Sequence, residues 1–344
     1  MDVLLADRYQ TTHLLGVGGA ASVYRAVDRN LGRDVAVKIF NPTTSDDDSY
    51  RRQHTETMLL STLNHPGLVT LHDAGIHEDE DGRTTGFLVM ELVDGEDLRH
   101  LLRRGPIPAV DVAQLGADLA DALAYIHSEG VVHRDVKPAN ILMFHSGDNS
   151  TRLYPKLTDF GIARMVEATM ATAVGATIGT ANYLSPEQAK GDALDERSDI
   201  YSLGLVLLEC LTGQKAFPGP VVEAALARLL RHPDVPAALG PEWGDLLRGM
   251  TARDPGLRPY AHDVALQLRG FADDHVAPAA EVQRPGTLAG GARARVLQDD
   301  VPSCDSGSPD VATGGVITGG VITGGIITGN IRIPEPPGRA PSIR

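Results

Sequence analysis

Residues 133–140 read HRDVKPAN, and residues 159–161 read DFG. These two short stretches hold two carboxylates, Asp135 and Asp159, together with Lys137 and the amide of Asn140. Such a set suits phosphoryl transfer, in which a protein positions groups and neutralises charge more than it makes or breaks bonds itself. Asn140 and Asp159 also offer the hard oxygen atoms that magnesium prefers, and this metal is commonly held by one or two protein groups plus substrate phosphates. The two stretches therefore predict a metal-assisted phosphoryl-transfer site.

Upstream, residues 9–39 read as three strands that include a glycine-rich turn. The turn, within HLLGVGGAASVYRAVD, holds Gly16, Gly18 and Gly19, whose backbone amides can approach phosphates without a side chain in the way. A dinucleotide-binding fold also uses such glycines, but it requires a helix directly after them. Here another strand follows, with Lys38 in VAVK. The pattern therefore disfavours a dinucleotide fold.

Taken together, the motifs resemble those of the bacterial eukaryotic-like serine/threonine protein kinases. The resemblance covers about residues 7–271, and the separated motifs come in the family's order, from the glycine-rich turn to LRPYAHD. It implies an α+β, bilobal protein-kinase fold over residues 1–275. A small antiparallel β-rich lobe with one main helix, about residues 7–93, would join a larger, mostly helical lobe, about residues 94–275, around an ATP cleft.

The resemblance assigns catalytic roles to four residues. Asp135 would accept or orient the proton of the attacking hydroxyl, and Lys137 would offset the charge of the transferred phosphate. Lys38 would align the ATP phosphates while paired with Glu56, on a helix expected over residues 51–63. Every catalytic position is filled, which disfavours the rival interpretation of a pseudokinase scaffold whose tail recruits partners.

The resemblance also implies ATP as the nucleotide, with Asn140 and Asp159 as ligands of Mg²⁺ and Mn²⁺ as an alternative metal. Met90 would be the gatekeeper, and the backbone of Glu91 and Val93 would bind adenine. The full set of expected ATP-binding residues is Leu15, Gly16, Val17, Gly18, Gly19, Val23, Ala36, Lys38, Met90, Glu91, Val93 and, as the pocket floor, Leu142.

Arg134 precedes the catalytic aspartate, and in the family an arginine there accompanies activation by phosphorylation of a nearby loop. The candidate acceptors are Thr172 first, Thr169 second and then Thr177. Thr180 matches a threonine that contacts the catalytic aspartate and lysine in serine/threonine kinases. Together with Lys137 it indicates serine or threonine as the acceptor, in protein substrates or in a second copy of the chain within a homodimer.

Other positions match structural residues of the family, which are His133, Arg134, Thr180, Asp199 bracing the catalytic loop, and Glu187 paired with Arg258. Two positions depart from the pattern. Ala21 replaces the third glycine of the turn, and Ser185 stands where the family usually has the alanine of APE. Neither departure falls on a group that performs the chemistry.

Apolar spacing predicts helices over residues 110–129, 221–230, 241–250 and 261–271. Residues 144–155, FHSGDNSTRLYP, exceed the length of a tight hairpin and are expected to form a surface insertion.

Composition limits the remaining classes. The 344 residues carry a net charge of −14 and only two cysteines, Cys210 and Cys304. We therefore expect no nucleic-acid partner, a cytoplasmic location, and a buried Cys210 in place of a disulfide framework. The N-terminus has neither the positive start nor the apolar core of a signal peptide.

After residue 275 the composition changes to proline, glycine, alanine and aspartate. Residues 276–312 are expected to be a disordered linker, followed by a low-complexity tail over residues 313–344 with TGGVI-type repeats. The conformational entropy of its glycines favours a flexible end for this repeat. Its uncharged pairs of β-branched residues would instead suit a β-assembly with other copies of the chain. A membrane span is disfavoured, because the run is rich in glycine and threonine and lacks the leucine-type apolarity of an inserted helix.

Overall fold

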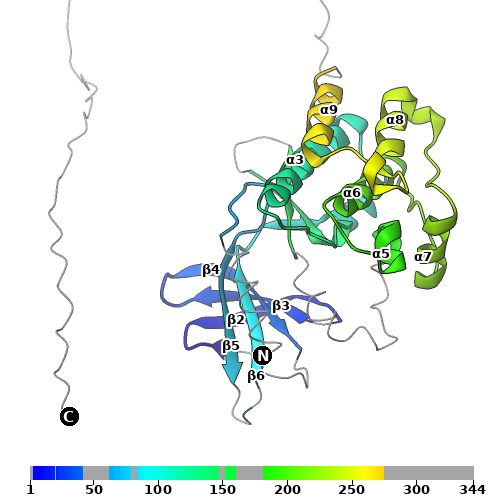
Figure 1. Ribbon diagram of the computed structural model, residues 1–344. Coiled ribbons are helices and arrows are strands. Elements are labelled where there is room, and N and C mark those ends of the chain that lie inside the picture. The colour runs from blue at the N-terminus through cyan, green and yellow to red at the C-terminus, as the bar shows by residue number, and fades with distance from the viewer. Residues whose placement is uncertain are drawn as a thin grey trace, which may run out of the picture. The chain divides into compact units, whose positions relative to one another are not determined.

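The computed structural model describes residues 3–19, 21–41, 62–78, 82, 84–146, 152–159 and 181–274 (Figure 1). The predictions for Glu56, Thr169, Thr172, Thr177 and Thr180 lie outside these residues, as do those for the linker and the repeat tail. Within the described ranges, no helix combines the length and apolarity that crossing a bilayer would take.

The smaller lobe is an antiparallel sheet. Its strands are β1 (Leu4–Leu5), β2 (Tyr9–Val17), β3 (Ala21–Asp28), β4 (Arg33–Phe40), β5 (Leu71–Glu78) and β6 (Thr84–Met90), in the order β1-β2-β3-β4-β6-β5. Successive side chains on a strand point to opposite faces. Val35 and Val37 therefore enter the lobe's apolar core with Phe87 and Val89, while the intervening residues of β4 face the other way.

The hairpin of β2 and β3 extends beyond this core. Leu14, Leu15 and Val17 are each more than half exposed. At the turn, the N–H of Gly18 donates to the carbonyl of Ala21 at 2.8 Å, and a Cβ on Gly18 would lie only 3.3 Å from that oxygen. The close approach favours glycine at this position, where no side chain separates the backbone from solvent.

The larger lobe is mostly helical (Figure 1). Its α-helices are α2 (Leu98–Leu102), α3 (Ala109–Ser128), α5 (Pro186–Lys190), α6 (Arg197–Thr212), α7 (Val221–Leu230), α8 (Gly240–Met250) and α9 (Ala261–Asp274). Gly116 of α3 lets three helices meet, because a Cβ there would lie 2.8 Å from Leu268 of α9 and 3.0 Å from Leu207 of α6. This contact packs α3 closely against α6 and α9.

A second sheet includes the strand that directly follows residues 133–140. Its strands are β7 (Gly95–Asp97), β8 (Ile141–His145) and β9 (Leu153–Leu157), in the order β7-β8-β9. Leu157 accepts from Val69 N–H and donates to the Gly67 carbonyl, both at 2.8 Å, so β9 is tied to the chain that leads into β5. The residues just after β9 are thereby fixed next to the smaller lobe.

The bilobal α+β class is confirmed, and the helices over α3, α7, α8 and α9 begin within one residue of their predicted starts. The expectation for residues 144–155 was wrong at both ends, because they belong to β8 and β9 and pair in register, Phe144 with Tyr154 and His145 with Leu153. Of the helix expected over residues 51–63, only Thr62 and Leu63 are described, and neither is helical. Cys210 is buried and unpaired, as predicted.

Candidate active site

Three side chains of the catalytic loop, residues 133–140, contact one another directly. Lys137 Nζ lies 2.7 Å from Asp135 Oδ2, and Asn140 Nδ2 donates to the same oxygen at 2.9 Å. Asn140 Nδ2 also donates to the backbone carbonyl of Asp135 at 2.9 Å. The short helix η1 (Pro138–Asn140) turns the chain back and makes this spacing possible. One oxygen of Asp135 is therefore fixed, while Oδ1 has no donor within the described part of the chain.

The side chain of Asp199 holds the backbone of this loop. Asp199, in the first turn of α6, accepts from the N–H of His133 at 2.8 Å through Oδ2 and from the N–H of Arg134 at 2.7 Å through Oδ1. Arg134 has φ +67°, a left-handed conformation that costs a non-glycine residue roughly 1–2 kcal/mol. The buried carboxylate of Asp199 stabilises that conformation, so the bracing contact expected from the sequence is present.

His133 connects the catalytic loop to the segment that follows β9. Its Nδ1 accepts from the N–H of Asp135 at 3.2 Å, and its Nε2 lies 3.1 Å from the carbonyl of Thr158, which requires the proton on Nε2. The residue is fully buried. Both ring nitrogens are used for packing the loop, in line with the structural role expected for this histidine.

Asp159 follows Thr158, whose N–H donates to the carbonyl of Asn140 at 2.9 Å, and it pairs with Lys38, whose Nζ is 2.6 Å from Asp159 Oδ1. Asp159 also adopts a left-handed backbone, with φ +62°, and its side chain is 34% exposed. Among the described residues, Lys38 thus pairs with Asp159, and its expected partner Glu56 lies outside them.

The oxygen atoms left over fit a hard cation. No donor in the described ranges contacts Asn140 Oδ1 or Asp159 Oδ2, and none of the described residues form a cluster of three His, Cys, Asp or Glu side chains suited to a metal. A metal held mainly by nucleotide phosphates needs only one or two protein ligands. The donor set therefore fits Mg²⁺ or a similar divalent ion at Asn140 and Asp159.

Strand register gathers the expected nucleotide residues on one face of the small sheet. Lys38 lies directly opposite Val23 on β3, and Ala36, two residues before Lys38, lies opposite Met90 on β6. Residues directly opposite each other, or two apart on a strand, share a face. Val23, Ala36, Lys38 and Met90 therefore line the face that turns away from the valine core. The remaining expected contacts lie at the hairpin (Leu15, Gly16, Val17, Gly18, Gly19), after β6 (Glu91, Val93) and on β8 (Leu142).

The segment after β6 refines the adenine prediction. The N–H of Glu91 already donates to the carbonyl of Thr70 at 2.8 Å, so only the carbonyl of Glu91 is available to a base. The carboxylate of Glu91 contacts Lys156 Nζ at 2.7 and 2.8 Å and accepts from Thr70 N–H at 3.3 Å. Sequence reasoning missed Lys156, because nothing in LYPKLTDFG pairs it with a residue so far upstream.

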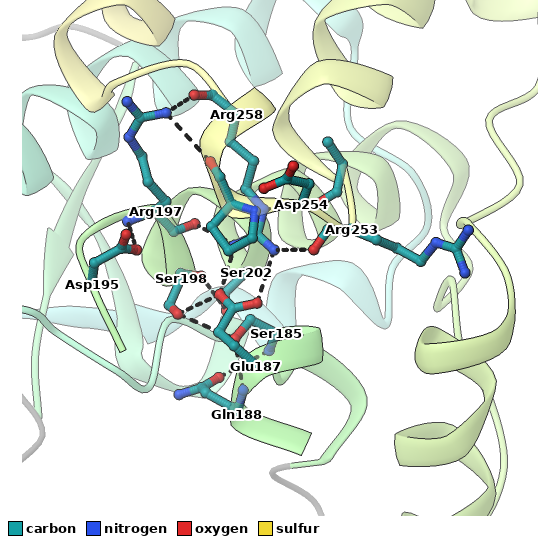
Figure 2. Close-up of polar contacts among 12 residues, drawn as sticks. Ser185, Glu187, Gln188, Asp195, Arg197, Ser198, Ser202, Arg253, Asp254 and Arg258 are labelled. Atoms are coloured by element: carbon teal, nitrogen blue, oxygen red, sulfur yellow. Dashed lines mark hydrogen bonds and ion pairs between the residues drawn. The ribbon is translucent and has the colours of Figure 1, made fainter. Parts of the chain in front are cut away.

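A buried network joins Glu187 of α5, Ser198 of α6 and Arg258, which precedes α9 (Figure 2). Arg258 Nη1 and Nη2 donate to Glu187 Oε1 and Oε2 at 2.6 and 2.9 Å, and Ser198 Oγ donates to Oε1 at 2.5 Å. Burial raises the pKa of Glu187, but the bonds from Arg258 and Ser198 outweigh it and lower the pKa to about 2. The ion pair expected from the sequence is present.

Comparisons with known proteins agree with this geometry. The model of the family described as the protein kinase domain matches residues 9–267. Serine/threonine-protein kinase PknB of Mycobacterium leprae is 43% identical over 235 residues, covering 67% of this chain and 37% of that protein. Serine/threonine-protein kinase PknA of Mycobacterium tuberculosis is 37% identical over 280 residues, covering 78% of this chain and 63% of that protein.

Serine/threonine-protein kinase PknB of Mycolicibacterium smegmatis is 40% identical over 274 residues and is covered to 42% of its length. The chain thus spans 37% to 63% of the length of these three relatives. Kinases of this family use ATP and a divalent metal, which matches the lysine and the spare oxygens described above. Since the family match extends over most of the chain and includes both lobes, the chain belongs to the protein kinase domain family.

Proposed function

We propose that this chain transfers the γ-phosphate of ATP to serine or threonine hydroxyls of proteins, with Mg²⁺ as the metal. The observation that carries the proposal is the contact of Lys137 and Asn140 with one oxygen of Asp135, together with the Lys38–Asp159 pair. This arrangement leaves the second oxygen of Asp135 to receive a hydroxyl proton. The relatives named above, which are called serine/threonine-protein kinases, support the same class of acceptor.

In the proposed reaction a protein hydroxyl oxygen forms a bond to the γ-phosphorus, and the bond to the leaving ADP oxygen breaks. Asp135 orients the hydroxyl and takes its proton, while Lys137 offsets charge on the transferred group. Lys38 positions the phosphates from the sheet side. A divalent ion bound through Asn140 and Asp159 would neutralise charge on the phosphate oxygens.

The test is transfer of radiolabelled phosphate from ATP to a generic basic protein and to the chain itself. Asp135→Asn removes the proton acceptor but keeps a side chain of the same size, so we expect transfer to fall by about 10²–10⁴-fold. The matched control is Asp263→Asn, at an exposed position on α9, which should transfer at the wild-type rate. Full activity in Asp135→Asn would refute the role of this aspartate, and nucleotide binding without any wild-type transfer would favour a pseudokinase scaffold.

We propose in addition that phosphorylation of a threonine within residues 169–177 switches the enzyme on. Arg134 Nε is buried and has no hydrogen-bond acceptor within the described residues. A phosphate on Thr172, or second on Thr169 or Thr177, would supply an acceptor of opposite charge. Mass spectrometry after incubation with ATP should find phosphate on one of these threonines, and a highly active preparation that carries none would contradict this.

Phosphorylation of one copy by another is the proposed route, through a transient homodimer. An Asp135→Asn copy with a size tag should then acquire phosphate when mixed with wild-type chain, and remain unmodified alone. If only the wild-type copy is labelled at every concentration, the reaction is within one chain.

We place the activity in the cytoplasm as a further proposal, which rests on the two-cysteine composition and is checked by cell fractionation.

A further inference from the structure

Gln188 uses both ends of its side-chain amide. Oε1 accepts from the N–H of Ser185 at 2.9 Å, and the N–H of Gln188 donates to Ser185 Oγ at 3.2 Å, which together form a capping box at the start of α5. Nε2 donates to the carbonyl of Arg134 at 2.7 Å. Figure 2 shows Gln188 beside Ser185 at the edge of the Glu187 network. One side chain therefore connects α5 to the catalytic loop.

The bond from Gln188 acts on the peptide group directly before Asp135. This group has the Arg134 carbonyl at one end and the Asp135 N–H at the other, and that N–H donates to His133 Nδ1 at 3.2 Å. With both ends held, the peptide plane can rotate only by breaking two hydrogen bonds. The direction of the Cα–Cβ bond of Asp135, and hence of its carboxylate, depends on that plane.

Arg134 needs a constraint on both sides because its left-handed backbone is intrinsically unfavourable. Asp199 holds the N–H of Arg134 at 2.7 Å, which constrains φ. Rotation about ψ moves the carbonyl, and in the described part of the chain Gln188 is the donor that holds it. Asp199 and Gln188 thus approach the same residue from α6 and α5.

We propose that Gln188 is a positioning residue for phosphoryl transfer, acting on Asp135 through the Arg134 carbonyl. The proposal rests on the proposed function, because it assigns Gln188 a part in that reaction. The site needs an acceptor toward Ser185 and a donor toward Arg134 from the same side chain. Glutamine supplies both, whereas an ionised glutamate can only accept.

Two substitutions separate the two halves of this role. Gln188→Glu keeps the acceptor of the capping box, where glutamate is common, and removes the donor to Arg134. Ser185→Ala removes the capping hydroxyl and keeps that donor. Each variant thus serves as the control for the other.

We expect kcat of Gln188→Glu to fall about tenfold, with KM for ATP within about twofold of wild type, because an unpaired carbonyl affects Asp135 and not the nucleotide site. Ser185→Ala should keep kcat within about twofold of wild type and lower Tm by about 2–4 °C, as expected for loss of a cap. Hydrogen exchange of the peptide that contains Arg134 and Asp135 should be faster in Gln188→Glu only.

Wild-type kcat in Gln188→Glu, or an equal loss of kcat in both variants, would overturn the proposal. Unchanged hydrogen exchange at Arg134 and Asp135 in Gln188→Glu would also overturn it. If the wild type transfers no phosphate, the proposed function fails, and the exchange experiment still decides whether Gln188 orders this loop.

Discussion

The catalytic cluster, formed by Asp135, Lys137, Asn140 and Asp159, and the Glu187 network differ in which hydrogen-bonding atoms they leave without a partner. Around Glu187, all five N–H donors of the Arg258 guanidinium meet an acceptor, and both carboxylate oxygens are occupied. In the catalytic cluster, Asp135, Asn140 and Asp159 each keep an oxygen without a donor in the described residues. Asp135 and Asp159 are 20% and 34% exposed, against 0% for Arg258.

This difference separates a binding site from a structural support. Buried polar groups are normally satisfied, and a network that satisfies itself internally contributes to holding the fold. Spare acceptors next to solvent have no such use, but they can bind a cation, a phosphate or a hydroxyl. The following experiments test whether the two clusters separate in this way.

The largest expected effect is on stability, from Arg258→Met. The substitution leaves Glu187 buried without its partner, so the free energy of unfolding should fall by about 3–5 kcal/mol in urea titrations. Arg248→Met provides the control, because its ion pair with Asp245 is exposed and should contribute under about 1 kcal/mol. Equal losses in the two variants would mean that the Glu187 network does not support the fold.

Asp159→Asn should have the next largest effect, this time on the reaction. It removes one charge that pairs with Lys38 and would bind the metal, so kcat for phosphate transfer should fall by about 10²–10³-fold. The free energy of unfolding should change by less than about 1 kcal/mol, since Asp159 is one-third exposed. A large loss of stability with retained kcat would place Asp159 with the structural network.

The pH dependence of stability offers a finer test of Glu187. Its pKa is about 2 in the folded protein and ordinarily 4.5, so the ionised form stabilises the fold at every pH above 4.5. That contribution disappears as the pH falls from 4.5 to about 2. Glu187→Gln should therefore have a lower Tm at pH 7 and a flatter decline of Tm across this window. Parallel Tm curves for the variant and wild type would show that another group controls acid unfolding.

The smallest expected effect is at the segment after β6. Lys156→Met breaks the pair with Glu91, whose carboxylate is 30% exposed, so KM for ATP should rise by roughly twofold to fivefold while kcat stays within twofold. Lys190→Met, at an exposed position on α5, should leave both parameters unchanged. A loss of kcat in Lys156→Met would indicate that the pair also positions the catalytic loop.

Local patterns were enough for several of the long elements, although the sequence analysis gave no range for α6 or β5. The three-strand segment before residue 40 and the helix starts followed from strand alternation and helical spacing, which depend on nearby residues only. Short elements were missed, because β1, β7 and α5 are too brief for a period to be visible. The strands within residues 144–155 were missed for a related reason, since β8 and β9 are recognisable only from their pairing with each other.

Contacts between residues close in the sequence could be predicted, whereas contacts between distant segments could not. Asp135, Lys137 and Asn140 lie within six residues of one another, so the sequence HRDVKPAN already determined that they could meet. The pattern S-x-x-Q at Ser185 was also a readable signal for a capping box. By contrast, Lys38 with Asp159, Lys156 with Glu91 and Gln188 with the Arg134 carbonyl join distant segments.

The sequence by itself determined which chemical groups this protein has and, through its motifs, the family to which it belongs. Only the tertiary structure decided which of those groups are satisfied and which stay available. The reason is that hydrogen-bond saturation and burial depend on segments far apart in the chain, such as α5 and α6 meeting the catalytic loop at Arg134. No local pattern encodes whether an oxygen atom will find a donor there.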